Sequence, residues 1–78
     1  MRVDIPSSVM KVFRDPNLPP AVRQVIASLL TNPIPPDALP IPERPGRYEI
    51  FESDYWIQFE VLHDREETVA KVLLIESN

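Results

Sequence analysis

Residues 46–75 read GRYEIFESDYWIQFEVLHDREETVAKVLLI, and this stretch decides the fold. Apolar and polar side chains alternate over residues 47–52 and again over residues 55–62, with Ser53-Asp54 between them. Alternation with a period of two is typical of β-strands, and a short polar pair between two such runs predicts a tight turn. A polar turn at residues 63–67 and a third strand at residues 68–75 follow.

The alternation also assigns side chains to the two faces of the sheet. In the second of these strands one face carries Tyr55, Ile57, Phe59 and Val61, and the other carries Trp56, Gln58, Glu60 and Leu62. In the last strand, strict alternation places Val69, Lys71, Leu73 and Ile75 on one side and Ala70, Val72 and Leu74 on the other. Two largely apolar faces predict a central position for the last strand.

The first 45 residues contain all ten prolines, so this part cannot be continuous sheet. Residues 1–5 alternate and predict a short strand, and Ser7 or Ser8 offers an N-cap for a helix that ends before Asp15-Pro16. A second helix is expected from Pro19-Pro20 to the Thr31-Asn32-Pro33 stop. Its apolar stripe consists of Val22, Val25, Ile26, Leu29 and Leu30.

Residues 33–45 form a proline-rich connector between the helices and the meander. It is interpreted as a stiff, extended segment with Ile34, Leu39 and Ile41 held against the core. A ligand for a proline-recognising domain is the alternative interpretation. Residues 1–78 are therefore predicted to be one α+β domain of two layers, of order β-α-α-β-β-β, with an antiparallel sheet and both helices on one face.

Composition excludes several classes of protein. The chain has 78 residues, a hydrophobic fraction of 44% and a net charge of −4, which suits one modest core and argues against non-specific nucleic-acid binding. With no cysteine and a single histidine, disulfides and thiolate or all-histidine metal sites are excluded. No window approaches the ~20 apolar residues of a membrane span. We expect a cytoplasmic protein with no cofactor, no metal and no membrane partner.

Four segments together resemble the RelE/ParE toxin superfamily of toxin–antitoxin systems. They are Leu18–Ile26, Leu29–Pro33, Gly46–Ile50 and the strand Asp54–Val61, and the resemblance extends over residues 1–75. It implies a small bacterial toxin that an antitoxin neutralises by wrapping it with an extended or helical segment. It also implies one of two activities, metal-independent mRNA cleavage on the ribosome by RelE-like members or gyrase inhibition by ParE-like members.

This chain departs from the basic residues that RelE-like cleavage requires. Glu49 and Trp56 stand where the family has cations, Asn78 stands about where it has a further arginine, and no residue stands at its tyrosine position. A carboxylate ~4 Å from a phosphate costs on the order of 1 kcal/mol even in water. Arg47 is the only basic side chain of the strand at residues 47–52 and could retain a phosphate contact. The competing interpretation is that Arg47 is a solvated arginine at the end of the strand, paired with a nearby acid.

The sequence therefore predicts a non-catalytic, toxin-like protein that binds an antitoxin-like protein through Trp56, Phe51 and Leu62, with Leu74 as a further member of that surface. A ribosome-dependent mRNA endonuclease and a host interaction module or homo-oligomer remain the alternatives. Coverage of Trp56 by the connector is equally compatible with the sequence. An acid–base pair of Glu49 and Glu60 is disfavoured, because the sequence offers neither a nucleophile nor a buried environment that would raise a carboxyl pKa. His63 is interpreted as a solvated turn residue.

Overall fold

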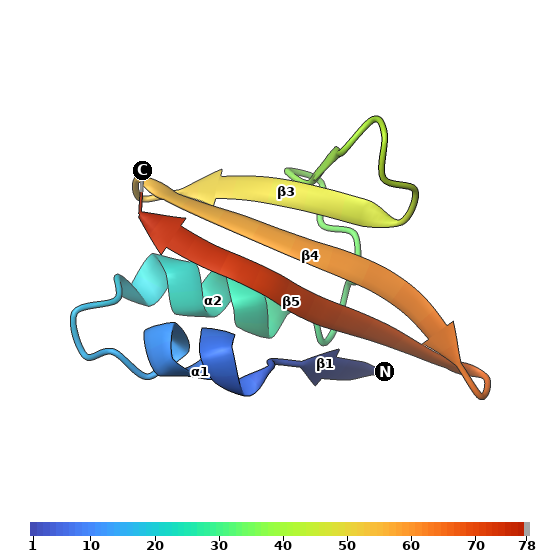
Figure 1. Ribbon diagram of the computed structural model, residues 1–78, viewed down its shortest axis with the longest axis horizontal. Coiled ribbons are helices and arrows are strands. Elements are labelled where there is room, and N and C mark those ends of the chain that lie inside the picture. The colour runs from blue at the N-terminus through green and yellow to red at the C-terminus, as the bar shows by residue number, and fades with distance from the viewer. Residues whose placement is uncertain (78) are drawn as a thin grey trace.

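The computed structural model describes residues 1–77, and Figure 1 shows their arrangement as a sheet with two helices. The elements in chain order are β1 (Arg2–Asp4), α1 (Ser7–Phe13), α2 (Pro20–Ser28), β2 (Leu39–Pro40), β3 (Arg47–Glu52), β4 (Tyr55–Asp64) and β5 (Glu67–Ser77). The α+β class and the C-terminal meander of three strands are thus confirmed.

The sheet is mixed, which corrects the prediction of an antiparallel sheet. Its strand order is β1-β5-β4-β3-β2, and β1 runs parallel to β5 with Val3 opposite Ala70. A parallel pair requires a long crossover, because a tight hairpin can join only antiparallel strands. Here both helices and the strands β2, β3 and β4 lie between β1 and β5 in the chain, and β5 has a strand on each side, as its apolar faces predict.

The proline-rich connector contributes a fifth strand at the edge. Leu39 and Pro40 of β2 lie opposite Glu49 and Tyr48 of β3. Proline is tolerated there because an edge strand needs no donor on its outer side. The prediction that Ile34 and Leu39 are held in the core is wrong, since they are 44% and 53% exposed. The loop that follows β2 extends beyond the β3 edge of the sheet, on the side away from β1 (Figure 1).

Both hairpins of the meander close with two residues in the left-handed backbone region. Ser53 and Asp54 have φ angles of 50° and 64°, and Arg65 and Glu66 have φ angles of 50° and 68°. Two consecutive positive φ values match the right-handed twist of the flanking strands. The first turn is where the sequence predicts it, and the second is shorter than the predicted residues 63–67 because β4 and β5 extend to Asp64 and Glu67.

A bulge in β5 overturns the predicted faces of that strand. Gln58 lies opposite Leu74 but Phe59 lies opposite Val72, so Leu73 has no partner on β4. An extra residue in one strand reverses the alternation beyond it. Ala70, Val72 and Ile75 consequently share the face toward the helices, whereas strict alternation separates Ile75 from the other two.

α1 begins at Ser7, slightly earlier than predicted, and both helices end before their predicted stops. Pro6 and not a serine occupies the N-cap of α1, and its carbonyl accepts the N–H groups of Val9 and Met10. Pro19 caps α2 in the same way, and α2 ends at Ser28, before the predicted stop. Of the predicted stripe, Leu30 is 52% exposed and does not belong to the core.

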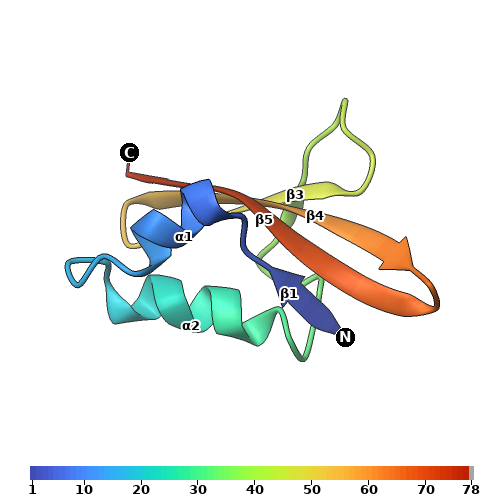
Figure 2. The same cartoon turned by 60° about the horizontal axis from the view of Figure 1, so that its bottom comes forward.

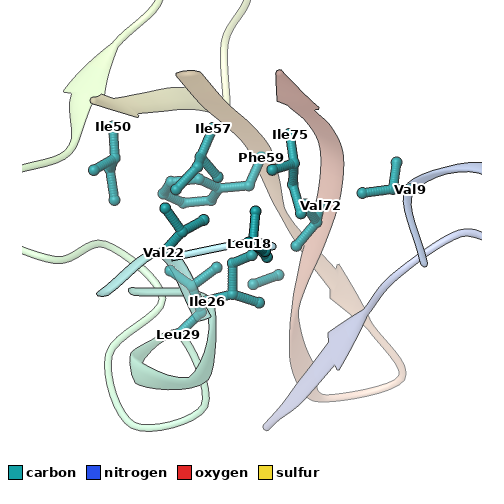
Figure 3. Close-up of a cluster of buried hydrophobic side chains, with 11 residues drawn as sticks. Val9, Leu18, Val22, Ile26, Leu29, Ile50, Ile57, Phe59, Val72 and Ile75 are labelled. Atoms are coloured by element: carbon teal, nitrogen blue, oxygen red, sulfur yellow. The ribbon is translucent and has the colours of Figure 1, made fainter. Parts of the chain in front are cut away.

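One core fills the space between the sheet and the helices. Figure 3 shows Ile57 and Phe59 of β4 directed at Val22 and Ile26 of α2, with side chains of β3 and β5 on either side. Phe59 is fully buried and stacks on Tyr48, with ring centroids 5.7 Å apart. The complete cluster is Val9, Leu18, Val22, Ile26, Leu29, Ile50, Ile57, Phe59, Ala70, Val72 and Ile75.

Two phenylalanines on neighbouring strands provide a matched test of this core. Phe59 is fully buried and Phe51 is 54% exposed. We expect Phe59→Ala to lower the free energy of unfolding by about 3–5 kcal/mol, because it leaves a cavity. We expect Phe51→Ala to lower it by less than about 1 kcal/mol. Urea denaturation measures both, and equal losses would contradict the assignment of the two faces.

Candidate functional site

The face of the sheet opposite the helices, here called the open face, is where the sequence places its candidate site. The register puts on it Leu39 of β2, Arg47, Glu49 and Phe51 of β3, Trp56, Gln58, Glu60 and Leu62 of β4, and Val69, Lys71, Leu74 and Glu76 of β5. Figure 2 shows the molecule turned so that α2 lies below the sheet, on the side away from this face.

An apolar patch lies at one end of the open face. Phe51 and Trp56 are directly opposite each other on β3 and β4. Leu39 lies opposite Glu49 and so diagonally from Phe51, and Leu74 lies opposite Gln58 and so diagonally from Trp56. We call these four residues, Leu39, Phe51, Trp56 and Leu74, the aromatic patch. Phe51 and Leu39 are more than half exposed, and Trp56 is half-buried.

Glu49 holds the tryptophan in place. The indole Nε1–H of Trp56 donates a hydrogen bond to Oε2 of Glu49, with the two atoms 3.1 Å apart. Satisfying the indole N–H leaves the ring's apolar surface available for contact while it fixes the ring's orientation. Glu49 and Trp56 are the two positions where the resemblance implies cations, and here they bond to each other.

A charged band crosses the middle of the open face. Glu60 lies opposite Arg47 on one neighbouring strand and opposite Lys71 on the other. Nε of Arg47 is 3.4 Å from Oε2 of Glu60, and these side chains are 33% and 24% exposed. Arg47 is therefore engaged by an acid, as the competing interpretation of this residue predicts. Glu49 and Glu60 each have a separate partner, and they do not face each other across the strands.

Leu62 does not join the aromatic patch. It lies on the same face, opposite Val69, but six residues along β4 from Trp56, which is about 20 Å at roughly 3.3 Å per residue. The charged band lies between them. The predicted group of Trp56, Phe51 and Leu62 is thus divided by the structure into an aromatic pair and a separate leucine.

The open face ends beyond Leu62 in an ionic corner. Arg2 is 2.9 Å from carboxylate oxygens of both Asp4 and Glu67, and 3.8 Å from Asp64. The hydrogen bond and the charge of Asp4 raise the pKa of Arg2 above its ordinary value. The adjacent Val69 is only 1% exposed, so this end offers little apolar surface to a partner.

The described residues contain no metal centre. No group of three histidine, cysteine or acidic side chains in residues 1–77 is arranged to hold an ion. His63 is exposed in β4, near the second turn, with its Nδ1 atom 3.5 Å from the hydroxyl of Thr68. Asn78, which stands where the resemblance implies an arginine, lies outside the described residues.

Leu39 is the member of the patch that the sequence does not reveal. Its proline-rich neighbours carry no alternation, and its position depends on pairing with β3 through Glu49. The connector pairs along the outer edge of β3 and supplies Leu39 to the patch, and Phe51 is 54% exposed.

Comparison of the chain with protein-family models, with curated proteins and with solved structures finds no match. Within residues 1–77, no helix has the length and apolar character needed to cross a membrane.

A double-mutant cycle tests whether Arg47 belongs to a structural ion pair. We expect Arg47→Ala and Glu60→Ala to show a coupling of about 0.5–1 kcal/mol in unfolding experiments, because both side chains remain partly solvated. The coupling is expected to fall in high salt. A cycle between Glu60 and the exposed Arg44 is the control, and a coupling there as large as the first would contradict a specific pair.

Proposed function

We propose that this chain is a RelE/ParE-like protein without nuclease chemistry that acts by binding a protein partner, an antitoxin-like segment, on its open face. The family part of the proposal is supported by the four segments quoted above. The order of a strand, two helices and a three-stranded meander is compatible with it, with β2 as an addition.

The observation that carries the binding proposal is the aromatic patch. Phe51 and Trp56 are directly opposite each other on the face away from the helices, where Phe51 is 54% exposed and Trp56 is half-buried. Exposed aromatic clusters on soluble proteins mark interaction surfaces, and tryptophan dominates the energetics of many interfaces. The bond to Glu49 prepares the indole for binding, since less side-chain freedom is lost when a partner arrives.

Charge near the patch indicates the chemistry of the partner. Glu49 is beside Trp56 on β3, and Glu76 lies opposite Trp56 on β5. The nearest cation of the open face on β3, Arg47, is already paired with Glu60. A partner segment that combines apolar side chains with lysine or arginine complements this arrangement.

The nuclease alternative is disfavoured by the same charges. A polyanionic RNA strand over the patch would meet the carboxylates of Glu49 and Glu76. A symmetric homodimer through the patch is disfavoured as well. A two-fold interface would bring these carboxylates near their own copies.

Co-expression with the products of the flanking open reading frames tests the proposal. We expect one of them to co-purify as a stable complex. Trp56→Ala is expected to weaken the complex at least about thirty-fold, as for an interface residue worth about 2 kcal/mol. Isothermal titration of the purified pair measures the loss, and added salt is expected to weaken binding further.

Leu62→Ala is the matched control, because Leu62 is an exposed apolar residue on the same face but outside the patch. It is expected to change the affinity less than about three-fold. The proposal is contradicted if neither neighbour binds. It is also contradicted if the chain alone cleaves mRNA in translating ribosomes and Arg47→Ala abolishes this cleavage, which is the nuclease outcome.

A further inference from the structure

β1, α1 and α2 come together on the helical side of the molecule (Figure 2). A second apolar surface lies where they meet. One hollow of about 270 Å³ is lined by Val3, Ile5, Phe13, Ile26, Ala27 and Leu30. A second hollow of about 440 Å³ adjoins it and is lined by Ile5, Ser7, Met10, Lys11 and Arg14. Ile5 lines both hollows, and together they are here called the α1 groove.

The α1 groove has a firm base. Phe13 is fixed at the end of α1 by Arg23 of α2, whose guanidinium lies 5.4 Å from the ring centroid. The same guanidinium donates hydrogen bonds to the carbonyl oxygens of Phe13 and Asp15. Ile26 is 2% exposed and belongs to the core. Most of the lining residues belong to β1, α1 and α2, and Ile5, Arg14 and Leu30 lie just beyond the ends of these elements.

Two cations stand at its rim without a counter-charge. Lys11 and Arg14 line the hollow, both are exposed, and neither takes part in an ion pair within residues 1–77. In the described part of the chain the ion pairs involve only Arg2 and Arg47 among the basic side chains, so Lys11 and Arg14 are distinguished by their place beside an apolar hollow.

We infer that the α1 groove binds an acidic amphipathic helix of a protein partner. Leucine-like side chains of that helix would enter the two hollows, as in helix-in-groove recognition. Its glutamates or aspartates would reach Lys11 and Arg14, which lie three residues apart and so on one side of α1. The proposal goes beyond the open face, whose carboxylates favour a partner segment of opposite charge.

Two designed peptides of about four helical turns test the inference. Both carry leucine along one face, and the other face carries glutamate in the first and lysine in the second. Each is titrated into the isotopically labelled full chain, and amide shifts are followed by NMR. We expect the glutamate peptide to shift the amides of Ile5, Met10 and Ala27 and to bind at least about ten-fold more tightly than the lysine peptide, a difference of roughly 1.4 kcal/mol.

Variants then assign the effect to the groove. Ala27→Glu places a carboxylate at the exposed rim and is expected to abolish binding of the glutamate peptide. The double variant Lys11→Glu/Arg14→Glu is expected to reverse the preference between the peptides. Lys71→Glu, the same reversal on the open face, is the control and is expected to leave the preference unchanged. Thermal unfolding confirms that each variant is folded.

Several results would overturn the inference: equal affinity for both peptides, shifts confined to the open face, or no shift at millimolar glutamate peptide. Concentration-dependent shifts of the groove amides in the chain alone would also overturn it, in favour of a second copy as the occupant. The titration of Trp56→Ala with the flanking gene product tests the open face, and the peptide titrations test the α1 groove. Failure of either proposal therefore does not decide the other.

Discussion

The packing of β5 against β4 on one side and the helices on the other is the constraint on which the rest of the structure depends. A chain of this size has a single core, and Phe59 contributes its largest fully buried side chain. A slip of one residue in either strand would turn the core side chains outward. The unpaired Leu73 lets Ile75 and Val72 face the helices together. The aromatic patch exists on the other face because this register is maintained.

The same register explains why the open face has little to offer a phosphate. It sets Glu60 between Arg47 and Lys71, and it sets Glu76 opposite Trp56. Charges at cross-strand positions interact first with their neighbours in the sheet, so a cation in the sequence need not be a cation available to a ligand. Arg47 illustrates this, because its guanidinium lies against Glu60 and only a third of its side chain is exposed.

Local patterns predict much of this fold, and long-range pairings account for what they miss. The alternation in β3 and β4 assigns Ile50, Ile57 and Phe59 to the core because each face of those strands has its own polarity. In β5 both faces are apolar, so the sequence contains no signal for the bulge at Leu73. The direction of β1 and the strand at Leu39 likewise depend on partners far away in the chain.

In the candidate site, too, local alternation predicts some members and long-range pairing determines the others. Trp56 and Phe51 are predicted to share a face, and the two-residue turn between their strands makes them direct neighbours. Leu62 lies on the predicted face of the sheet, but at the opposite end of β4 from Trp56. Alternation predicts on which face a side chain lies, and it does not predict how far apart two side chains are along the strand. Leu39 is added by an edge strand whose prolines conceal any alternation.

The two halves of the chain differ in charge, and the fold turns this difference into two distinct surfaces. Residues 46–78 have eight acidic and three basic side chains, and the meander they form presents Glu49 and Glu76 beside Trp56. Residues 1–45 have five basic and four acidic side chains, and they place Lys11 and Arg14 at the α1 groove. Because the helices and the open face lie on opposite sides of one sheet, a single segment of one charge cannot complement both. A partner that engages both surfaces must therefore be bipartite, with a basic part over Trp56 and an acidic helix against α1.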